Sequence, residues 1–249
     1  MKELLVIIPA YNEEMNIIGV VEELKRDIPQ ADIVVINDCS TDGTLEKLKE
    51  NNVNYITTPF NLRYAGGVQT GFKYASEKGY RNVAQFDGDG QHIASELAKM
   101  FELAKKEDID IVIGSRFLVK TDYNHPFFRR VGTGVFQKII KLVTGKTITD
   151  PTTGLQVISK RVYSKYAKIN NYPEFPDTTL IIEMLLLGYT IKEVPVKMKE
   201  RIYGESMHSG IWKPITYMIG MIYSILLITL KHRDLKKMSL ESRGGKNGN

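Results

Sequence analysis

Five short apolar runs, each followed by a segment with helical features, constrain the fold of this chain most strongly. They lie at 4–8, 32–37, 54–57, 82–86 and 109–114. The first run, Leu4-Leu-Val-Ile-Ile8, is apolar throughout, which is typical of a strand buried on both faces of a parallel sheet. Strands that alternate with helices at this spacing indicate βαβ units. The sequence therefore predicts an α/β fold with a Rossmann-like, mostly parallel sheet flanked by helices.

Helices are predicted between these strands from capping residues and apolar spacing. Asn12 is expected to cap a helix over 13–27, and Ser95 a helix ending near 106. The turn-forming cluster 38–44 is expected to open another helix, and Gly79 to end one over 65–78.

Size and composition favour one large domain in a reducing compartment. The chain has 249 residues, 43% of them hydrophobic, and its single cysteine, Cys39, excludes an internal disulfide. The first apolar run is too short and too soon followed by acids to be a signal peptide. No run reaches the roughly 18–20 apolar residues of a membrane-spanning helix, and the polar tail 239–249 is expected to be disordered.

The polar residues that follow these runs are expected to form a site. Ligands of parallel sheets bind beyond the carboxyl ends of the strands, where Tyr11, Glu13, Asp38, Asp87 and Asp89 would all lie. Gly88 and Gly90 let the backbone bend so that Asp87 and Asp89 both face one cleft. Two such carboxylates suit Mg²⁺ or Mn²⁺, with coordination positions left for a substrate diphosphate. The alternative is an Asp-Gly turn without a ligand.

Two nucleotide-binding classes are excluded by the residues present in this chain. A dinucleotide-binding dehydrogenase needs G-x-G-x-x-G after the first strand, whereas this chain has Pro9-Ala-Tyr-Asn-Glu13 there. A P-loop is also absent from the sequence. The acids suggest instead a site that holds base and ribose by hydrogen bonds and the diphosphate through a metal.

Four motifs in this order resemble family 2 glycosyltransferases of the GT-A fold. They are Pro9–Glu13, Asn37–Thr44, Asn61–Gly71 and Asp87–Gln91, and the resemblance covers about residues 1–115. One departure is that the family usually has Asn, any residue and Gly in the third motif, where this chain has Asn61-Leu62-Arg63. Arg63 either contacts phosphate or lies at the surface.

The resemblance implies a role for each motif residue. The nucleotide pocket is lined by Pro9, Ala10, Tyr11 and Glu13. Asp38 holds the base or ribose, although simple turn chemistry is an alternative for Tyr11 and Asp38. Asp87 reaches the ribose or a metal-bound water, Asp89 binds the metal that bridges the diphosphate, and Gln91 lies near the transferred sugar.

A second resemblance concerns the acceptor. Subfamilies that load a sugar onto polyprenyl phosphate, such as the dolichyl-phosphate-mannose synthases, carry Gly-Ser-Arg, then Arg-Arg with a hydroxyl residue, then Asp and a Thr/Ser-Gly. The matching residues here are Arg116, Arg129-Arg130 with Thr133, and Asp150 to Gly154. The resemblance implies that Arg116, Arg129, Thr133 and Asp150 bind the acceptor, although Asp150 is equally suited to cap a helix.

The resemblance also implies residues for catalysis and phosphate binding, because many inverting members of the family place an acid near 176–187 as general base. Asp177 is the first candidate for a general base and Glu183 the second, although an acceptor phosphate is already ionised and needs little proton removal. The stretch 201–209 resembles the family's loop over the donor phosphates, with Arg201 as a ligand and His208 as a weaker candidate.

Two segments of the second half are expected to form amphipathic or interfacial helices. The segment 127–144 has apolar residues at helical spacing together with basic ones, which fits either membrane-surface binding or an ordinary core-facing helix. The segment 211–230 is the most apolar of the chain, and Lys231, Arg233, Lys236 and Lys237 follow it. It is predicted to be a membrane-associating or partner-docking helix over 211–238, with packing on the sheet as the alternative.

These observations predict a catalytic domain over 1–210, with a nucleotide-sugar half (1–115) and an acceptor half (116–210). The expected activity is inverting, metal-dependent transfer of a hexose or N-acetylhexosamine from a UDP-sugar to polyprenyl phosphate. The protein is expected to lie peripherally on the cytoplasmic membrane face, with a small membrane partner or a second copy, and without nucleic acid. The alternatives are transfer to a saccharide hydroxyl in cell-wall or surface polysaccharide assembly, and a non-catalytic scaffold.

Overall fold

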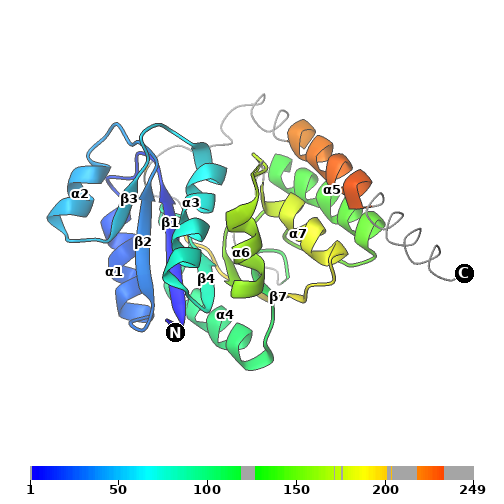
Figure 1. Cartoon of the computed structure of the whole chain (residues 1–249), viewed down its shortest axis with the longest axis horizontal. Helices are drawn as coiled ribbons and strands as arrows, with labels where there is room; N and C mark the ends of the chain where they lie inside the picture. The colour runs from blue at the N-terminus through cyan, green and yellow to red at the C-terminus, as the bar shows by residue number, and fades with distance from the viewer. Residues whose placement is uncertain are drawn as a thin grey trace, which may run out of the picture.

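A seven-stranded sheet forms the centre of the protein in the computed structural model, which describes residues 2–118, 127–170, 172–174, 176–200, 203 and 218–232 (Figure 1). The strands, in the spatial order β3-β2-β1-β4-β6-β5-β7, are β1 (Leu4–Ala10), β2 (Asp32–Asn37), β3 (Tyr55–Thr57), β4 (Asn82–Gln85), β5 (Ile111–Ser115), β6 (Gln156–Ser159) and β7 (Ile191–Pro195). The helices are α1 (Ile17–Asp27), α2 (Thr44–Glu50), α3 (Arg63–Lys78), α4 (Ala94–Glu107), α5 (Phe127–Thr144), α6 (Lys160–Lys168), α7 (Pro176–Leu186) and a further helix, 218–232.

The position of β1 inside the sheet explains why its sequence is apolar without interruption. Leu4, Val6 and Ile8 point into the core on one face of the sheet, and Leu5 and Ile7 into the core on the other. Successive side chains of a strand point to opposite faces, so a strand covered on both sides has no position for a polar residue.

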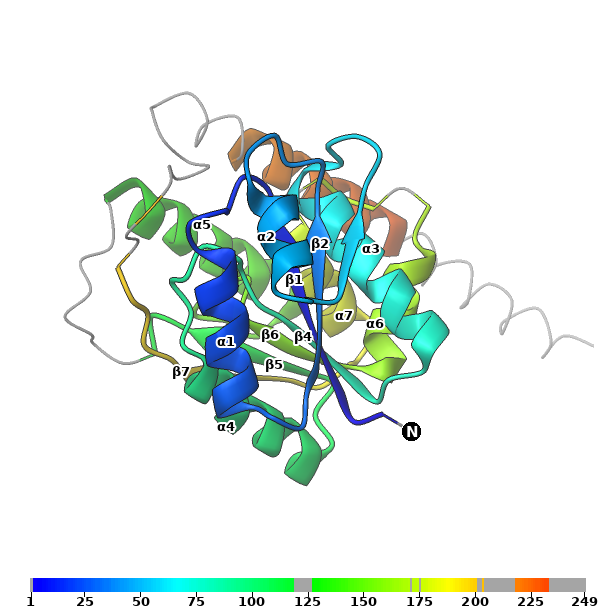
Figure 2. The same ribbon diagram turned by 90° about the vertical axis from the view of Figure 1, so that its left-hand side faces the viewer.

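Each face of the sheet is covered by its own set of helices. Helices α1 and α4 pack over one face, and α3 and α6 over the other, as the view in Figure 2 shows. Helix α3 approaches β1 closely because Gly71 lacks a side chain; a Cβ atom there would lie 2.8 Å from Ile7 Cγ2. The predicted α/β class with flanking helices is confirmed.

Strand β6 is the one antiparallel member of the described sheet. It lies between β4 and β5 and runs against both, whereas the other pairs are parallel. Its first residue, Gln156, is the direct neighbour of Gln85 at the end of β4. The predicted, mostly parallel sheet is confirmed, but β6 was not predicted from the sequence.

The predicted helix caps are only partly correct. Gly79 ends α3 with φ 75° and donates its N–H to Ala75 O at 2.9 Å, as expected. Helix α1, however, begins at Ile17 and not at Glu13, so the predicted cap by Asn12 is wrong. The side chain of Asn12 instead accepts a hydrogen bond from the backbone of Thr41. The predicted cap by Ser95 is also wrong, because α4 begins one residue earlier.

Helices α5, α7 and 218–232 form a second layer beside the sheet (Figure 1). Phe136 and Ile140 of α5 and Met221 and Ile225 of helix 218–232 are buried in the core that also holds α7. The predicted bounds of α5 are confirmed. Phe136 and Ile140 show that one side of this helix faces the core. Within the described part of the chain, no helix combines the length and apolar character needed to cross a bilayer.

Candidate active site

The predicted site residues that follow β1, β2, β4 and β5 lie at one edge of the sheet because these strands run in the same direction. Ala10 at the end of β1 is paired with Asn37 at the end of β2, and Ile7 is level with Gln85 at the end of β4. The segments that follow these strands therefore leave the sheet at the same edge. Arg116, directly after β5, lies at this edge as well.

The loops after β1 and β2 are fastened to each other by reciprocal hydrogen bonds. The backbone N–H groups of Thr41 and Gly43 donate to Asn12 Oδ1 at 2.8 Å and Glu14 Oε2 at 2.7 Å. In return, the Glu14 N–H donates to Asp42 Oδ2 at 3.1 Å. The loop after β1 carries Tyr11 and Glu13, two of the residues predicted to line the nucleotide pocket, and Tyr11 is 48% exposed. The other two, Pro9 and Ala10, are the last residues of β1.

Asp38 fixes a third loop at the same edge. Its side chain is buried, and Oδ1 accepts hydrogen bonds from the Thr58 hydroxyl and the Leu62 N–H, both at 2.8 Å. The residue thus joins β2 to the segment before α3 and not only to its own turn. Its contact with a base or ribose remains a prediction.

Arg63 occupies a backbone position that suits glycine. Its φ is 61°, in the left-handed region that favours residues without a Cβ atom. This conformation gives a physical reason for the glycine that the resembling family usually has there. The Arg63 side chain is largely exposed and forms an ion pair with Glu174, which agrees with the surface alternative; a phosphate contact remains a prediction.

Asp87 is held through both carboxylate oxygens. The Tyr64 hydroxyl donates to Oδ1 at 3.0 Å, and His92 Nε2 lies 3.1 Å from Oδ2. Gln85 Nε2 in turn donates to the Tyr64 hydroxyl at 2.6 Å. Burial alone would raise the pKa of Asp87, but His92 and Tyr64, together with the charge of Arg116, lower it below the ordinary value. Asp87 is therefore a fixed, ionised carboxylate.

Asp89 and Gln91 lie in the turn that comes next. Asp89 Oδ1 accepts the Gln91 N–H at 3.0 Å, and Gly90 adopts the left-handed φ of 75° that the turn requires. Both Asp89 and Gln91 are partly accessible. Within the described residues no three His, Cys, Asp or Glu side chains meet as a ready-made metal site. Two carboxylates at the open edge fit a cation that takes its other ligands from substrate oxygens and water.

Arg116 and Asp150 form a buried, bidentate ion pair. Arg116 Nε and Nη2 lie 2.6 and 2.8 Å from the two carboxylate oxygens, and the Arg116 N–H also donates to Oδ2. Burial lowers the pKa of Arg116, but the carboxylates of Asp150, Asp87 and Asp177 outweigh this effect and raise the pKa above the ordinary value. The guanidinium therefore stays charged. Glu193 accepts the Asp150 N–H at 2.8 Å. Asp150 begins no helix, so the alternative of a helix cap is wrong.

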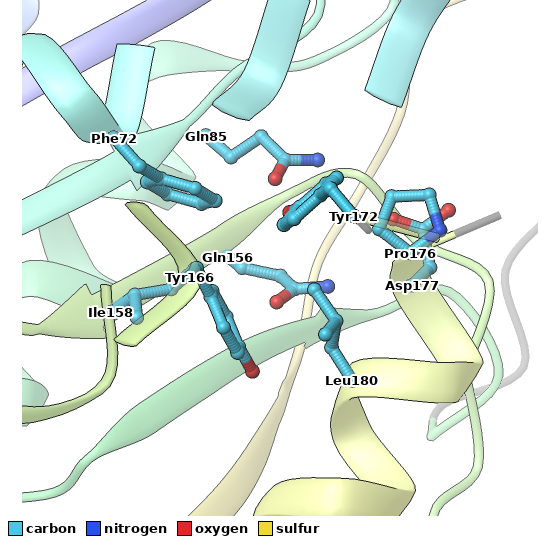
Figure 3. Close-up of a pocket in the computed structure, with 9 residues that line it drawn as sticks. All are labelled: Phe72, Gln85, Gln156, Ile158, Tyr166, Tyr172, Pro176, Asp177 and Leu180. Carbon is cyan, nitrogen blue, oxygen red and sulfur yellow. The ribbon is translucent and has the colours of Figure 1, made fainter. Parts of the chain in front are cut away.

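Asp177 lies in the first turn of α7 and lines a small pocket between the sheet and α3, α6 and α7 (Figure 3). The side chains of Gln85 and Gln156 extend toward the side of this pocket that carries Pro176 and Asp177. Burial, and next the charge of Asp87, raise the pKa of Asp177 to about 7, against the lowering effect of Arg116. Asp177 can therefore exchange a proton near neutral pH. Glu183 is not among the residues that line the pocket.

The remaining residues predicted to bind the acceptor or the donor phosphates are only partly described. Thr133 of α5 is buried, and its hydroxyl has no hydrogen-bond partner among the described residues. Gln137, one turn later on the same helix face, donates to Thr149 O at 2.6 Å, which brings this face beside Asp150. The side chain of Arg129 and residues Arg201 and His208 lie outside the described residues.

Three residues around Asp87 were not predicted from the sequence. Tyr64 lies within the third motif and His92 directly follows the fourth, but neither was assigned a role. Gln85 is a buried amide at the end of β4, after the apolar Val83 and Ala84. A polar side chain in a buried strand needs a partner, and this requirement could have singled out Gln85 in the sequence.

Comparison with known proteins identifies the family. The model of glycosyl transferase family 2 matches residues 5–167. A UDP-N-acetylglucosamine–dolichyl-phosphate N-acetylglucosaminyltransferase of Methanococcus voltae is 31% identical over 92% of this chain and 96% of its own. The polyprenol monophosphomannose synthase of Mycolicibacterium smegmatis is 28% identical over 83% of this chain and 81% of its own.

A solved structure confirms the GT-A type of fold. Glucosyl-3-phosphoglycerate synthase from Mycobacterium tuberculosis, in complex with Mg²⁺ and UDP, superposes with a TM-score of 0.65 over 90% of this chain and 79% of its own, at 13% identity. The predicted family is confirmed by the sequence matches, and the predicted fold by this superposition. The chain belongs to glycosyl transferase family 2 and is a glycosyltransferase.

Proposed function

We propose that this protein transfers a hexose or N-acetylhexosamine, with inversion, from a UDP-sugar to polyprenyl phosphate. The observation that carries the proposal is the cluster at the carboxyl edge of the sheet. There, the charge of the buried Arg116 lowers the pKa of Asp87, and the ionised Asp87 in turn raises the pKa of Asp177. The relatives named for transfer to dolichyl phosphate and for polyprenol monophosphomannose synthesis support the choice of acceptor.

The donor half of the proposal assigns the nucleotide sugar to the loops after β1, β2 and β4. Asp87 and Asp89 would hold Mg²⁺ or Mn²⁺, which supplies positive charge against the departing diphosphate. Related folds solved with Mg²⁺ and UDP, or with Mn²⁺ and UDP-glucose, support this assignment. The chain's own part is to fix the two carboxylates and to line the nucleotide pocket.

The acceptor half places the lipid phosphate between α5 and the Arg116–Asp150 pair. Thr133 lies on the face of α5 that reaches the loop beside Asp150, and Arg129 precedes it by one helical turn. An oxygen of the acceptor phosphate attacks the anomeric carbon, and the bond from that carbon to the diphosphate breaks. Because the phosphate is already ionised at pH 7, this reaction needs little help from a general base.

A peripheral position on the cytoplasmic membrane face belongs to the same proposal. The outer face of helix 218–232 exposes six large apolar side chains, here called the apolar face: Ile219, Ile222, Tyr223, Leu226, Leu227 and Leu230. Lys231 follows in the same helix, and Arg233, Lys236 and Lys237 follow in the sequence. Apolar surface beside basic residues suits an anionic leaflet.

A second candidate function is supported by Asp177. Its pKa of about 7 is suitable for a general base, which transfer to a saccharide hydroxyl in cell-wall or surface polysaccharide assembly would need. The acceptor separates the two functions, since the donor site is the same in both.

The decisive experiment offers purified protein a panel of labelled nucleotide sugars with Mn²⁺, with and without polyprenyl phosphate. We expect label to appear on the lipid with one UDP-sugar. Asp89→Asn should lower the rate by about 10³-fold or more, because the charge that faces the metal is lost. The melting temperature should hardly change, since Asp89 is partly accessible at the open edge. Transfer to saccharides alone would contradict the proposed acceptor. Asp89→Asn activity within about tenfold of wild type at saturating Mn²⁺ would contradict the metal-binding role of Asp89.

A further inference from the structure

Three residues from separate segments meet around the carboxylate of Asp87. Tyr64 comes from the first turn of α3, His92 from the turn after β4, and Gly154 from the loop before β6. Tyr64 and His92 contact one oxygen of Asp87 each. The His92 ring is 3% exposed and its edge packs on Phe86, with 5.4 Å between the ring centroids. The carboxylate thus has one orientation in which both contacts are made.

Gly154 leaves the space in which this carboxylate and the Tyr64 hydroxyl lie. A Cβ atom at residue 154 would be 2.8 Å from both Asp87 oxygens and 2.6 Å from the Tyr64 hydroxyl oxygen. The φ of Gly154 lies outside the left-handed region, so its backbone conformation does not itself require glycine. The requirement is therefore for space next to Asp87.

We infer that Gly154, Tyr64 and His92 are positioning residues, which fix the Asp87 carboxylate for the donor. They act through Asp87 and do not themselves touch the reacting atoms. Gly154 belongs to the segment that resembles the acceptor motif of the family. The inference therefore gives this loop a part in building the donor site. It rests on the proposed function in so far as Asp87 serves the donor.

A crystal structure of Gly154→Ala tests the geometry without any ligand. The new methyl group meets only the ends of two side chains, so the fold should persist while Asp87 and Tyr64 move aside. Gly19→Ala is the matched control, because a Cβ atom at this helical glycine of α1 has no atom within 4 Å. An Asp87 carboxylate in its original place, with both hydrogen bonds intact, would overturn the inference.

Calorimetric titration with UDP and Mn²⁺ tests the consequence for the donor. We expect affinity to fall about 10- to 100-fold in Gly154→Ala and in His92→Leu, as is typical when residues that orient a metal ligand are lost. His92→Gln, which keeps a donor near the position of Nε2, should recover part of the loss. Tyr64→Phe should weaken binding, whereas Tyr163→Phe, which loses a buried hydroxyl bond to Tyr80 O, should affect only the melting temperature.

The outcomes separate this inference from the proposed function. If wild type binds UDP and the Gly154, Tyr64 and His92 variants bind it equally well, the positioning role is wrong and the glycosyltransferase proposal stands. If wild type binds neither UDP nor any UDP-sugar, the proposed donor is wrong. The Asp87 geometry in the Gly154→Ala crystal then still decides whether these residues fix the carboxylate.

Discussion

The raised pKa of Asp177 lowers the stability of the fold at high pH but lets the residue exchange a proton near neutral pH. Its pKa of about 7 lies well above the ordinary value of 3.8, first because it is buried and next because Asp87 is close. The folded state therefore holds the proton more tightly than the unfolded chain does. The contribution of protonated Asp177 to the free energy of unfolding is fully present below about pH 4 and is lost as the pH rises through about 7.

Asp177→Asn should consequently raise the melting temperature at pH 8 and leave it nearly unchanged below pH 4. With polyprenyl phosphate as acceptor, the rate should fall by less than about tenfold, because no proton has to be removed. With a saccharide hydroxyl, it should fall by about 10²- to 10⁴-fold. In that case the wild-type rate should decline below pH 7, where Asp177 is protonated, and this acidic limb should be absent from the variant.

Glu102→Gln serves as the control, since Glu102 is exposed on α4 away from the site. Melting curves and pH–rate profiles of the three proteins provide the measurements. A melting temperature at pH 8 that does not rise in Asp177→Asn would show that the buried carboxylate carries no such cost.

The environment of Asp87 shows the limit of prediction from sequence for single residues. The order of parallel strands predicts that Asp38, Asp87 and Arg116 share an edge, and the structure brings them there. That Tyr64 reaches Asp87 depends on how closely α3 approaches β4. Periodicity indicates which face of a helix is buried, but it does not fix such a distance.

Among the elements, α3 shows how a glycine can be required within a helix. Gly71→Ala would normally stabilise a helix by up to about 1 kcal/mol. Here the added methyl group would press against the side chain of Ile7, which is fully buried and cannot move into solvent. We therefore expect Gly71→Ala to lower the free energy of unfolding by about 1–3 kcal/mol, as overpacked cores do.

Chemical denaturation measures this difference, with Gly19→Ala as the matched change in an open helical position. That control should be neutral or slightly stabilising. Equal effects in the two variants would mean that α3 can shift away from β1 at little cost.

Element prediction succeeded where the apolar pattern was long and failed where the structure was short or locally contested. The bounds of α5 over 18 residues are as predicted. Strand β6 has four residues and interrupts the parallel order, so the alternation of strands and helices gave no reason to expect it. Asn12 has the right chemistry for a helix cap, but the neighbouring loop competes for its side chain through Thr41.

For the whole molecule, the apolar face of helix 218–232 is the largest group of exposed apolar side chains on any one described element. Its opposite side is buried against α5 and α7, so the exposed leucines and isoleucines are not needed for packing within the described part of the chain. Ile222 and Leu226 are 42% and 55% exposed and lie one turn apart. Burial of two such side chains in lipid would contribute about 1.5–3 kcal/mol each.

The double change Ile222→Gln and Leu226→Gln should therefore weaken binding to anionic vesicles at least about tenfold. Sedimentation with phosphatidylglycerol–phosphatidylcholine vesicles measures this, and circular dichroism confirms the fold. Leu187→Gln, at a leucine that is 48% exposed beyond the end of α7, is the control. If the double variant sediments like wild type, the face serves a protein partner or a second copy instead of lipid.

The place of β6 in the sheet also has a consequence for how the protein is made. Strand β5 pairs in the described sheet only with β6 and β7, both of which come later in the chain. While the ribosome is still synthesising the chain between β5 and β6, β5 has no partner strand and β4 has an open edge. Open apolar edges pair readily with other chains. The nascent protein should therefore depend most on chaperones until Gln156–Ser159 has emerged and joined the two halves of the sheet.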